Sequence, residues 1–125
     1  MTPTTPLLST LESYLKLTTR REQAISANMA NVDTPGYHTR DINFDSELKR
    51  AMSGVLSQSE DGTGSVQISP VVREVQGLME RPDGNNVSLD REGLLMSETQ
   101  LQYQIGVQLI KHQFHQILSA ISGGS

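Results

Sequence analysis

Apolar residues near the start of the chain recur at alternating steps of three and four, the spacing of a coiled-coil seam. The row consists of Leu8, Leu11, Leu15, Ile25, Met29 and Val32, with the polar Thr18 and Glu22 completing the spacing. A residue before proline is disfavoured in the α conformation, and Thr34 precedes Pro35. We therefore expect a first helix that begins just after Pro6 and ends near Asn31.

The last third of the chain predicts a second long helix, from about Asp90 to Ile121. Its main apolar stripe consists of Met96, Tyr103, Val107, Ile110, Phe114, Ile117 and Ile121, with Gln100 completing the spacing. A second, partial stripe on a neighbouring face consists of Leu94, Leu101, Ile105 and Leu109. Apolar groups on two faces indicate more than one neighbour. Six positions of this helix are glutamines. Their amides can bond sideways without the desolvation cost of a charge, which favours a helix packed among helices.

The segment between these helices is short and irregular. Apolar spacing predicts a short helix from Asp45 to about Leu56, followed by a Gly/Ser-rich loop over 57–65. Residues 66–75 have the composition of a strand, and Pro70 restricts it to a sheet edge. "RPDG" (81–84) fits a type I turn, and Ser88 or Asp90 is the candidate cap of the last helix.

These patterns predict a mainly α fold. Long N- and C-terminal helices pair as an antiparallel coiled-coil hairpin, and a small irregular middle segment contains a short helix and an edge strand. The expected divisions are 1–32 for the first helix, 33–89 for the joint loop and middle segment, and 90–125 for the second helix. A length of 125 residues allows about one domain, so the three parts form one unit.

Composition narrows the classes of function. A net charge of −4 speaks against nucleic acid or an acidic membrane surface as the main partner. The sequence has no cysteine, which excludes disulfides and thiolate chemistry. No stretch approaches a membrane span, and the N-terminal residues lack the basic region of a signal peptide, so we expect no cleaved signal.

Candidate chemistry is sparse. His112 and His115 are three apart on the predicted helix, but no third metal ligand of suitable type lies at helical spacing beside them. No serine stands in a Gly-x-Ser-x-Gly elbow, and the glycines form no phosphate-binding pattern. We expect no catalytic residue, metal, cofactor, small-molecule substrate or nucleic-acid partner.

The stretch that ends the first helix carries the most specific pattern. Pro35 and Gly36 fit the central positions of a type II turn, with glycine supplying the positive φ. Asn28 and Asn31 lie on one face of the helix's last turn, where amides can tie free carbonyls to the following loop. Tyr37 has an apolar ring to pack on the helix and a hydroxyl to bond outward. Taken alone, Pro-Gly can also be a simple chain reversal.

In full, "SANMANVDTPGY" (26–37) resembles the signature Ser-x-Asn-x-Ala-Asn-x-x-Thr-Pro-Gly-Tyr of the rod, hook and hook-associated proteins of the bacterial flagellum. The stretches "HTRDINFDSEL" (38–48) and "GNNVSLDREGLLMSETQLQYQ" (84–104) resemble the proximal rod subunits of that family in particular. The resemblance covers nearly the whole chain and is weakest in the Gly/Ser loop and at the extreme N-terminus.

The resemblance implies a structural subunit of the proximal rod of the flagellar basal body. Such subunits are exported by the flagellar type III apparatus without a cleaved signal peptide and polymerise in the periplasm through their terminal helices. They join the export gate and adaptor to the distal rod, and they transmit torque. The implied partners are further copies of the chain, a FliE-type adaptor, export-gate proteins and the rod proteins FlgC and FlgF.

This hypothesis assigns a role to two sets of residues. The partner interface, within and between subunits, would comprise Leu8, Leu11, Leu15, Ile25, Met29, Tyr103, Val107, Ile110, Phe114, Ile117 and Ile121. The joint that fixes the angle between helix and middle segment would comprise Asn28, Asn31, Thr34, Pro35, Gly36 and Tyr37. The alternative is a soluble helical-hairpin adaptor or chaperone-like protein that does not polymerise. A small enzyme is the third hypothesis, and the thin core disfavours it.

Overall fold

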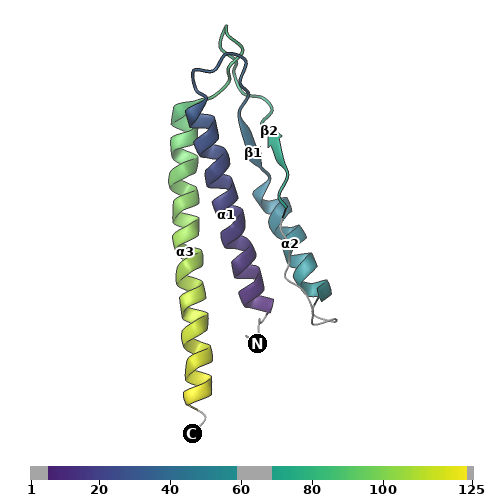
Figure 1. Cartoon of the computed structure of the whole chain (residues 1–125), viewed down its shortest axis with the longest axis vertical. Helices are drawn as coiled ribbons and strands as arrows, with labels where there is room; N and C mark the ends of the chain where they lie inside the picture. The colour runs from purple at the N-terminus through teal and green to yellow at the C-terminus, as the bar shows by residue number, and fades with distance from the viewer. Residues whose placement is uncertain (1–5, 59–68, 124–125) are drawn as a thin grey trace.

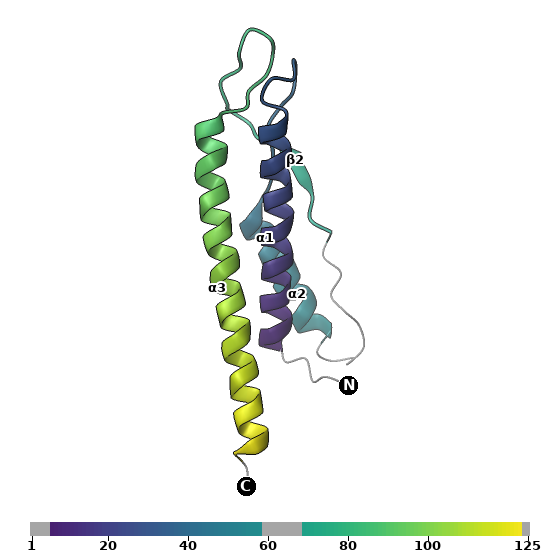
Figure 2. The same ribbon diagram turned by 60° about the vertical axis from the view of Figure 1, so that its left-hand side comes forward.

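The computed structural model describes residues 6–58 and 69–123. Along the chain its elements are α1 (Pro6–Ala30), β1 (Arg40–Ile42), α2 (Phe44–Gln58), β2 (Val72–Glu74) and α3 (Leu89–Ser122). α1 and α3 lie side by side and run antiparallel, while α2 and the two strands lie on the other side of α1 (Figure 1, Figure 2). The predicted mainly α fold, with paired terminal helices and a small middle segment, is confirmed.

Two contacts set the register of α1 against α3. At the loop end the side chain of Asn28 reaches Glu92. Farther along, Gly106 lies against Tyr14 and Leu15, and a β-carbon placed on it would be 2.7 Å from Leu15 Cδ2. Since a side chain has no room there, glycine lets the two helices approach closely. α3 is long, but neither it nor any other described helix is both long and apolar enough to cross a membrane.

The core is thin and lies on both sides of α1. Its buried apolar residues are Leu11, Leu17, Ile25, Ile42, Ala51 and Val87. Leu17 is completely buried, although the predicted seam omits it. It lies at helical spacing between Tyr14, which packs edge-on to Phe44 of α2, and Arg21, which pairs with Asp41 of β1. α1 therefore has a second neighbour, and a single stripe could not describe its burial.

In the middle segment, the bounds of the helix and the strand differ from those predicted, and a second strand is present. The predicted short helix is α2, but it extends through Gln58, so the first two residues of the expected loop are helical; residues 59–65 lie outside the described part of the chain. Of the expected strand over 66–75, only Val72–Glu74 pairs, and residues 66–68 are not described. Its partner β1 was not predicted, and the two form an antiparallel ladder with Ile42 opposite Val72.

Tyr14 gives the α1 contact a pH dependence. Burial raises the pKa of its hydroxyl above the ordinary value of 10.0. The folded chain therefore holds this proton more tightly than the unfolded chain, and the associated stability is lost as pH rises through the folded pKa. We expect the urea midpoint of the parent to fall more steeply than that of Tyr14→Phe between about pH 9 and 11. Equal slopes for the two chains would contradict this.

Candidate functional site

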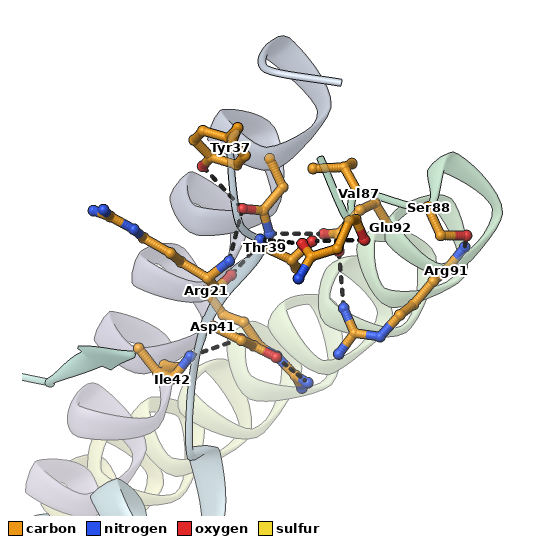
Figure 3. A network of polar contacts seen from close by, with 12 residues as sticks. Arg21, Tyr37, Thr39, Asp41, Ile42, Val87, Ser88, Arg91 and Glu92 are labelled. Atoms are coloured by element: carbon orange, nitrogen blue, oxygen red, sulfur yellow. Dashed lines mark hydrogen bonds and ion pairs between the residues drawn. The ribbon is translucent and has the colours of Figure 1, made fainter. Parts of the chain in front are cut away.

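The end of α1 is held by one buried amide, that of Asn28. Its Nδ2 group donates to the backbone oxygen of Arg40 at 2.8 Å and to Glu92 Oε2 at 3.1 Å. Its Oδ1 atom accepts from the Tyr37 hydroxyl and from the Arg40 backbone N–H, each at 3.0 Å. An amide has two donors and two acceptor lone pairs, so the hydrogen-bonding capacity of Asn28 is filled. One side chain thus joins α1, the loop after it, β1 and α3, and Figure 3 labels its partners Tyr37 and Glu92.

Glu92 is the α3 partner in this network, and it is completely buried. Its Oε2 atom accepts from Asn28, and its Oε1 atom accepts from the guanidinium of Arg91 at 2.8 Å. A buried carboxylate is costly unless it is paired and hydrogen-bonded, and both oxygens of Glu92 are satisfied. The carboxylate also lies in the first turns of α3, where the helix dipole favours negative charge.

The Thr-Pro-Gly-Tyr stretch forms the predicted type II turn. The Tyr37 backbone N–H donates to the Thr34 oxygen at 3.2 Å, and Gly36 has φ +75°. Asn31 Nδ2 donates back to the Ala27 oxygen, and its Oδ1 accepts from the Thr34 hydroxyl. The expectation that the Tyr37 hydroxyl bonds outward was wrong, because it points back to Asn28.

A second loop closes the joint from the α3 side. Asn85 is buried and its Nδ2 group donates to the backbone oxygens of both Asn31 and Thr34, at 2.9 and 2.8 Å. Asn86 Oδ1 accepts from the Thr39 backbone N–H at 2.6 Å. Side-chain amides of this loop therefore hold the backbone at the end of α1 and the backbone just before β1.

The third side of the joint is an ion pair between α1 and β1. Arg21 donates through Nε and Nη2 to the two carboxylate oxygens of Asp41, both at 3.2 Å. Both side chains are largely buried, and a two-pronged arginine–carboxylate pair fixes orientation as well as distance. Asp41 Oδ1 also accepts from the backbone N–H of Ile42. The joint thus ties β1 to α1 at two places along the helix.

The structure brings most residues of the predicted joint together at the end of α1. Asn28, Asn31, Thr34, Gly36 and Tyr37 all take part in it or shape its turn. The members that sequence reasoning did not name are Arg21, Thr39, Asp41, Asn85, Asn86, Arg91 and Glu92. The one available signal was the adjacent pair of asparagines just before the helix that Ser88 caps.

Comparison with known proteins decides the family. No family model matches the chain. The flagellar basal body rod protein FlgB of Salmonella typhimurium is 35% identical over 126 residues, covering 91% of each chain. The FlgB proteins of Escherichia coli and Proteus mirabilis are 32% and 31% identical, over 91% and 90% of this chain. The chain belongs to the FlgB family.

The predicted interface residues of this FlgB-family chain fall into three groups by burial. Leu11 and Ile25 are buried. The half-buried residues are Leu8, Leu15, Met29, Val107, Ile110 and Ile117. Tyr103, Phe114 and Ile121 are exposed, and so are Leu94, Leu101, Ile105 and Leu109 of the second stripe. Within one FlgB-family chain, α1 therefore covers only part of the apolar surface of α3.

The two histidines of α3 are not gathered into a site. His112 lies 3.2 Å from the side-chain amide of Gln116, through Nε2. Among the described residues, no group of three histidine, cysteine or acidic side chains is arranged to hold a metal ion. The polar contact to Gln116 is the interaction that the structure gives His112.

Gly36→Val tests the turn of the joint. A β-carbon at Gly36 would meet no atom within 4 Å, so the cost is conformational: a β-branched residue at φ +75° should lose about 2 kcal/mol. We expect the variant to be made at normal levels but to be depleted from basal bodies. Gly93→Val is the matched control, since Gly93 also has open space and its φ is not positive. Equal recovery of both variants from basal bodies would contradict the role of the turn.

Proposed function

We propose that this chain is a structural subunit of the proximal flagellar rod that polymerises through its terminal helices. Membership of the FlgB family supports a structural role in the basal body rod, because the relatives are named for that part. In this proposal the chain joins the export gate and a FliE-type adaptor on one side to FlgC and FlgF on the other. It reaches the periplasm through the flagellar type III apparatus.

The observation that carries the proposal is the exposed apolar surface of α3. Its exposed large apolar residues are Leu89, Leu94, Leu101, Tyr103, Ile105, Leu109, Phe114, Leu118 and Ile121. Isolated apolar residues on a surface are ordinary, but a row along two faces of one helix marks an interaction surface. Complete burial of each such side chain is worth about 1.5–3 kcal/mol, so covering this surface with neighbouring helices would drive assembly.

The joint supports the second part of the proposal, the transmission of torque. Hydrogen bonds have preferred angles as well as distances, so a network of them resists rotation better than apolar packing alone. Asn28 connects the end of α1 to the first turn of α3, and Asn85 connects it to the loop before α3. Arg21 ties α1 to β1 through Asp41. A load applied to the middle segment would therefore pass to both terminal helices.

A pair of matched variants tests the proposal. Leu101→Asp places a charge on an apolar position of α3 that is 58% exposed, so the isolated fold should tolerate it while a helix packed in an assembly should not. Gln104→Asp places the same charge on an exposed polar position of the same helix. Basal bodies are purified from cells making each variant, and the chain in them is quantified against the amount in whole cells.

The proposal expects the parent chain in basal bodies, with Leu101→Asp depleted and Gln104→Asp retained or less affected. Absence of the parent chain from basal bodies, with a stable monomer in the cell, would contradict the proposal and favour the non-polymerising adaptor. Equal incorporation of both variants would show that the exposed stripe of α3 is not an assembly surface.

A further inference from the structure

α3 is longer than the helix it packs against. α3 has 34 residues and α1 has 25, and the contacts of Asn28 with Glu92 and of Gly106 with Leu15 align their loop ends. Continued at the same rise, this register places Pro6 opposite Phe114. Residues 114–122, called here the α3 overhang, therefore extend about 12 Å past the first described residue of α1 (Figure 1, Figure 2).

One face of the overhang is apolar, and the overhang carries no Asp, Glu, Lys or Arg. Phe114, Leu118 and Ile121 follow at steps of four and three, so they share one face of the helix, and their exposures are 54%, 58% and 76%. Residues 114–122 contain no aspartate, glutamate, lysine or arginine. This is a helix end with an apolar stripe that residues 6–58 and 69–123 leave exposed.

A groove elsewhere on the same chain fits such a helix. It has a volume of about 400 Å³ and follows α1 from Glu12 to Gln23, a length of about 16 Å. Leu15 of α1, Tyr103 of α3 and Pro70, just before β2, supply its apolar walls. The length of the groove along α1 is close to that of the overhang.

The charges along the groove favour an uncharged helix end. Glu12 and Lys16 pair with each other at 3.5 Å, and Arg20 donates to Gln23 at 3.0 Å. The overhang brings no charged Asp, Glu, Lys or Arg side chain against these groups. The C-terminal end of a helix carries partial negative charge, and Lys16 and Arg20 lie where the last turns of an overhang would come to rest.

We propose that the α3 overhang of one copy docks in this groove of a second copy. The inference rests on the proposed rod function and names the surfaces that meet. In this contact both copies have the same orientation, so the overhang runs antiparallel to α1 of the second copy. The middle of the overhang then meets the middle of the groove, with Leu118 opposite Thr19. The flanking pairs are Phe114 with Gln23 and Ile121 with Leu15. That register differs from the pairing within one chain by roughly 16 residues, an axial offset of about 24 Å.

Two different surfaces meet in this contact, so it is heterologous. Repetition of a heterologous contact gives a ring or an open helical array rather than a closed dimer. The offset along the helix axis favours the helical array, in which each added copy offers a new empty groove and a new overhang.

Disulfide trapping tests the register, because the parent chain has no cysteine. Thr19→Cys with Leu118→Cys is introduced in one chain, and purified basal bodies are oxidised and run on a non-reducing gel. Within one chain these positions are about 25 Å apart along the helices, well beyond disulfide reach. We expect most of the chain to shift to the mass of two copies or more. Gln23→Cys with Phe114→Cys repeats the test at a second position.

Gln23→Cys with Ile121→Cys is the matched control, because it uses the same two surfaces about 10 Å out of register. Cross-linking in both in-register pairs, and its loss in the control, is the expected result. Variants that are incorporated but give no in-register product would overturn the docking and leave the rod function standing. A parent chain that is absent from basal bodies would overturn both.

Discussion

Asn28→Ala is expected to lower the free energy of unfolding by about 4 kcal/mol. Asn28 is 1% exposed and its amide makes four hydrogen bonds. Alanine would leave the Glu92 carboxylate with Arg91 alone and would deprive the Tyr37 hydroxyl and both backbone groups of Arg40 of a partner. Each buried polar group left without a partner costs about 1–3 kcal/mol, and relaxation recovers part of the sum.

Urea denaturation followed by circular dichroism measures this effect. Asn31→Ala is the matched control, because Asn31 is half-buried and its side chain makes two local hydrogen bonds. We expect that variant to lose about 1 kcal/mol. A loss for Asn28→Ala no greater than that for Asn31→Ala would mean that the four-way contact does not hold the joint.

Gly106→Leu is expected to destabilise the pairing of α1 and α3 by about 3 kcal/mol. Even a β-carbon at this position would be 2.7 Å from Leu15 Cδ2 and 3.1 Å from the Tyr14 ring. Alanine could be accommodated by a shift of Leu15, but leucine adds three further carbons and would force the helices apart. The same urea titration reports the change.

Gly93→Leu gives the opposite expectation for the same chemical change. Its β-carbon would meet no atom within 4 Å, and replacing glycine inside a helix by a good helix former gains about 1 kcal/mol. If Gly106→Leu proved as stable as the parent while Gly93→Leu behaved as expected, α3 would not lie as close to α1 as the structure places it.

The elements with strong local signals could be predicted from the sequence. Both terminal helices follow from apolar spacing sustained over many turns, and their ends follow from Pro35 and from the cap at Ser88. The turn at Gly36 follows from the conformational demands of a type II turn. In each case the residues that determine the structure are neighbours along the chain.

The features that could not be predicted depend on residues far apart in the sequence. Glu92 resembles an ordinary acidic residue of a first helical turn, and its burial depends on Asn28, 64 positions away. β1 has three residues, too few for a periodic signal, and it exists because β2 pairs with it. Leu17 lies off the seam because α1 packs against two neighbours, which one apolar stripe cannot reveal.

Amide hydrogen exchange tests whether α3 is covered only in the assembly, with the purified chain compared with the same chain in basal bodies and its mass in solution measured alongside. We predict a free monomer in which the amides of residues 107–122 exchange rapidly and those of the joint, such as Thr39 and Asn86, exchange slowly. In the rod both sets should exchange slowly, because neighbouring helices cover α3. Strong protection of residues 107–122 in a stable monomer would contradict the account, since the hairpin would then bury itself and need no neighbours.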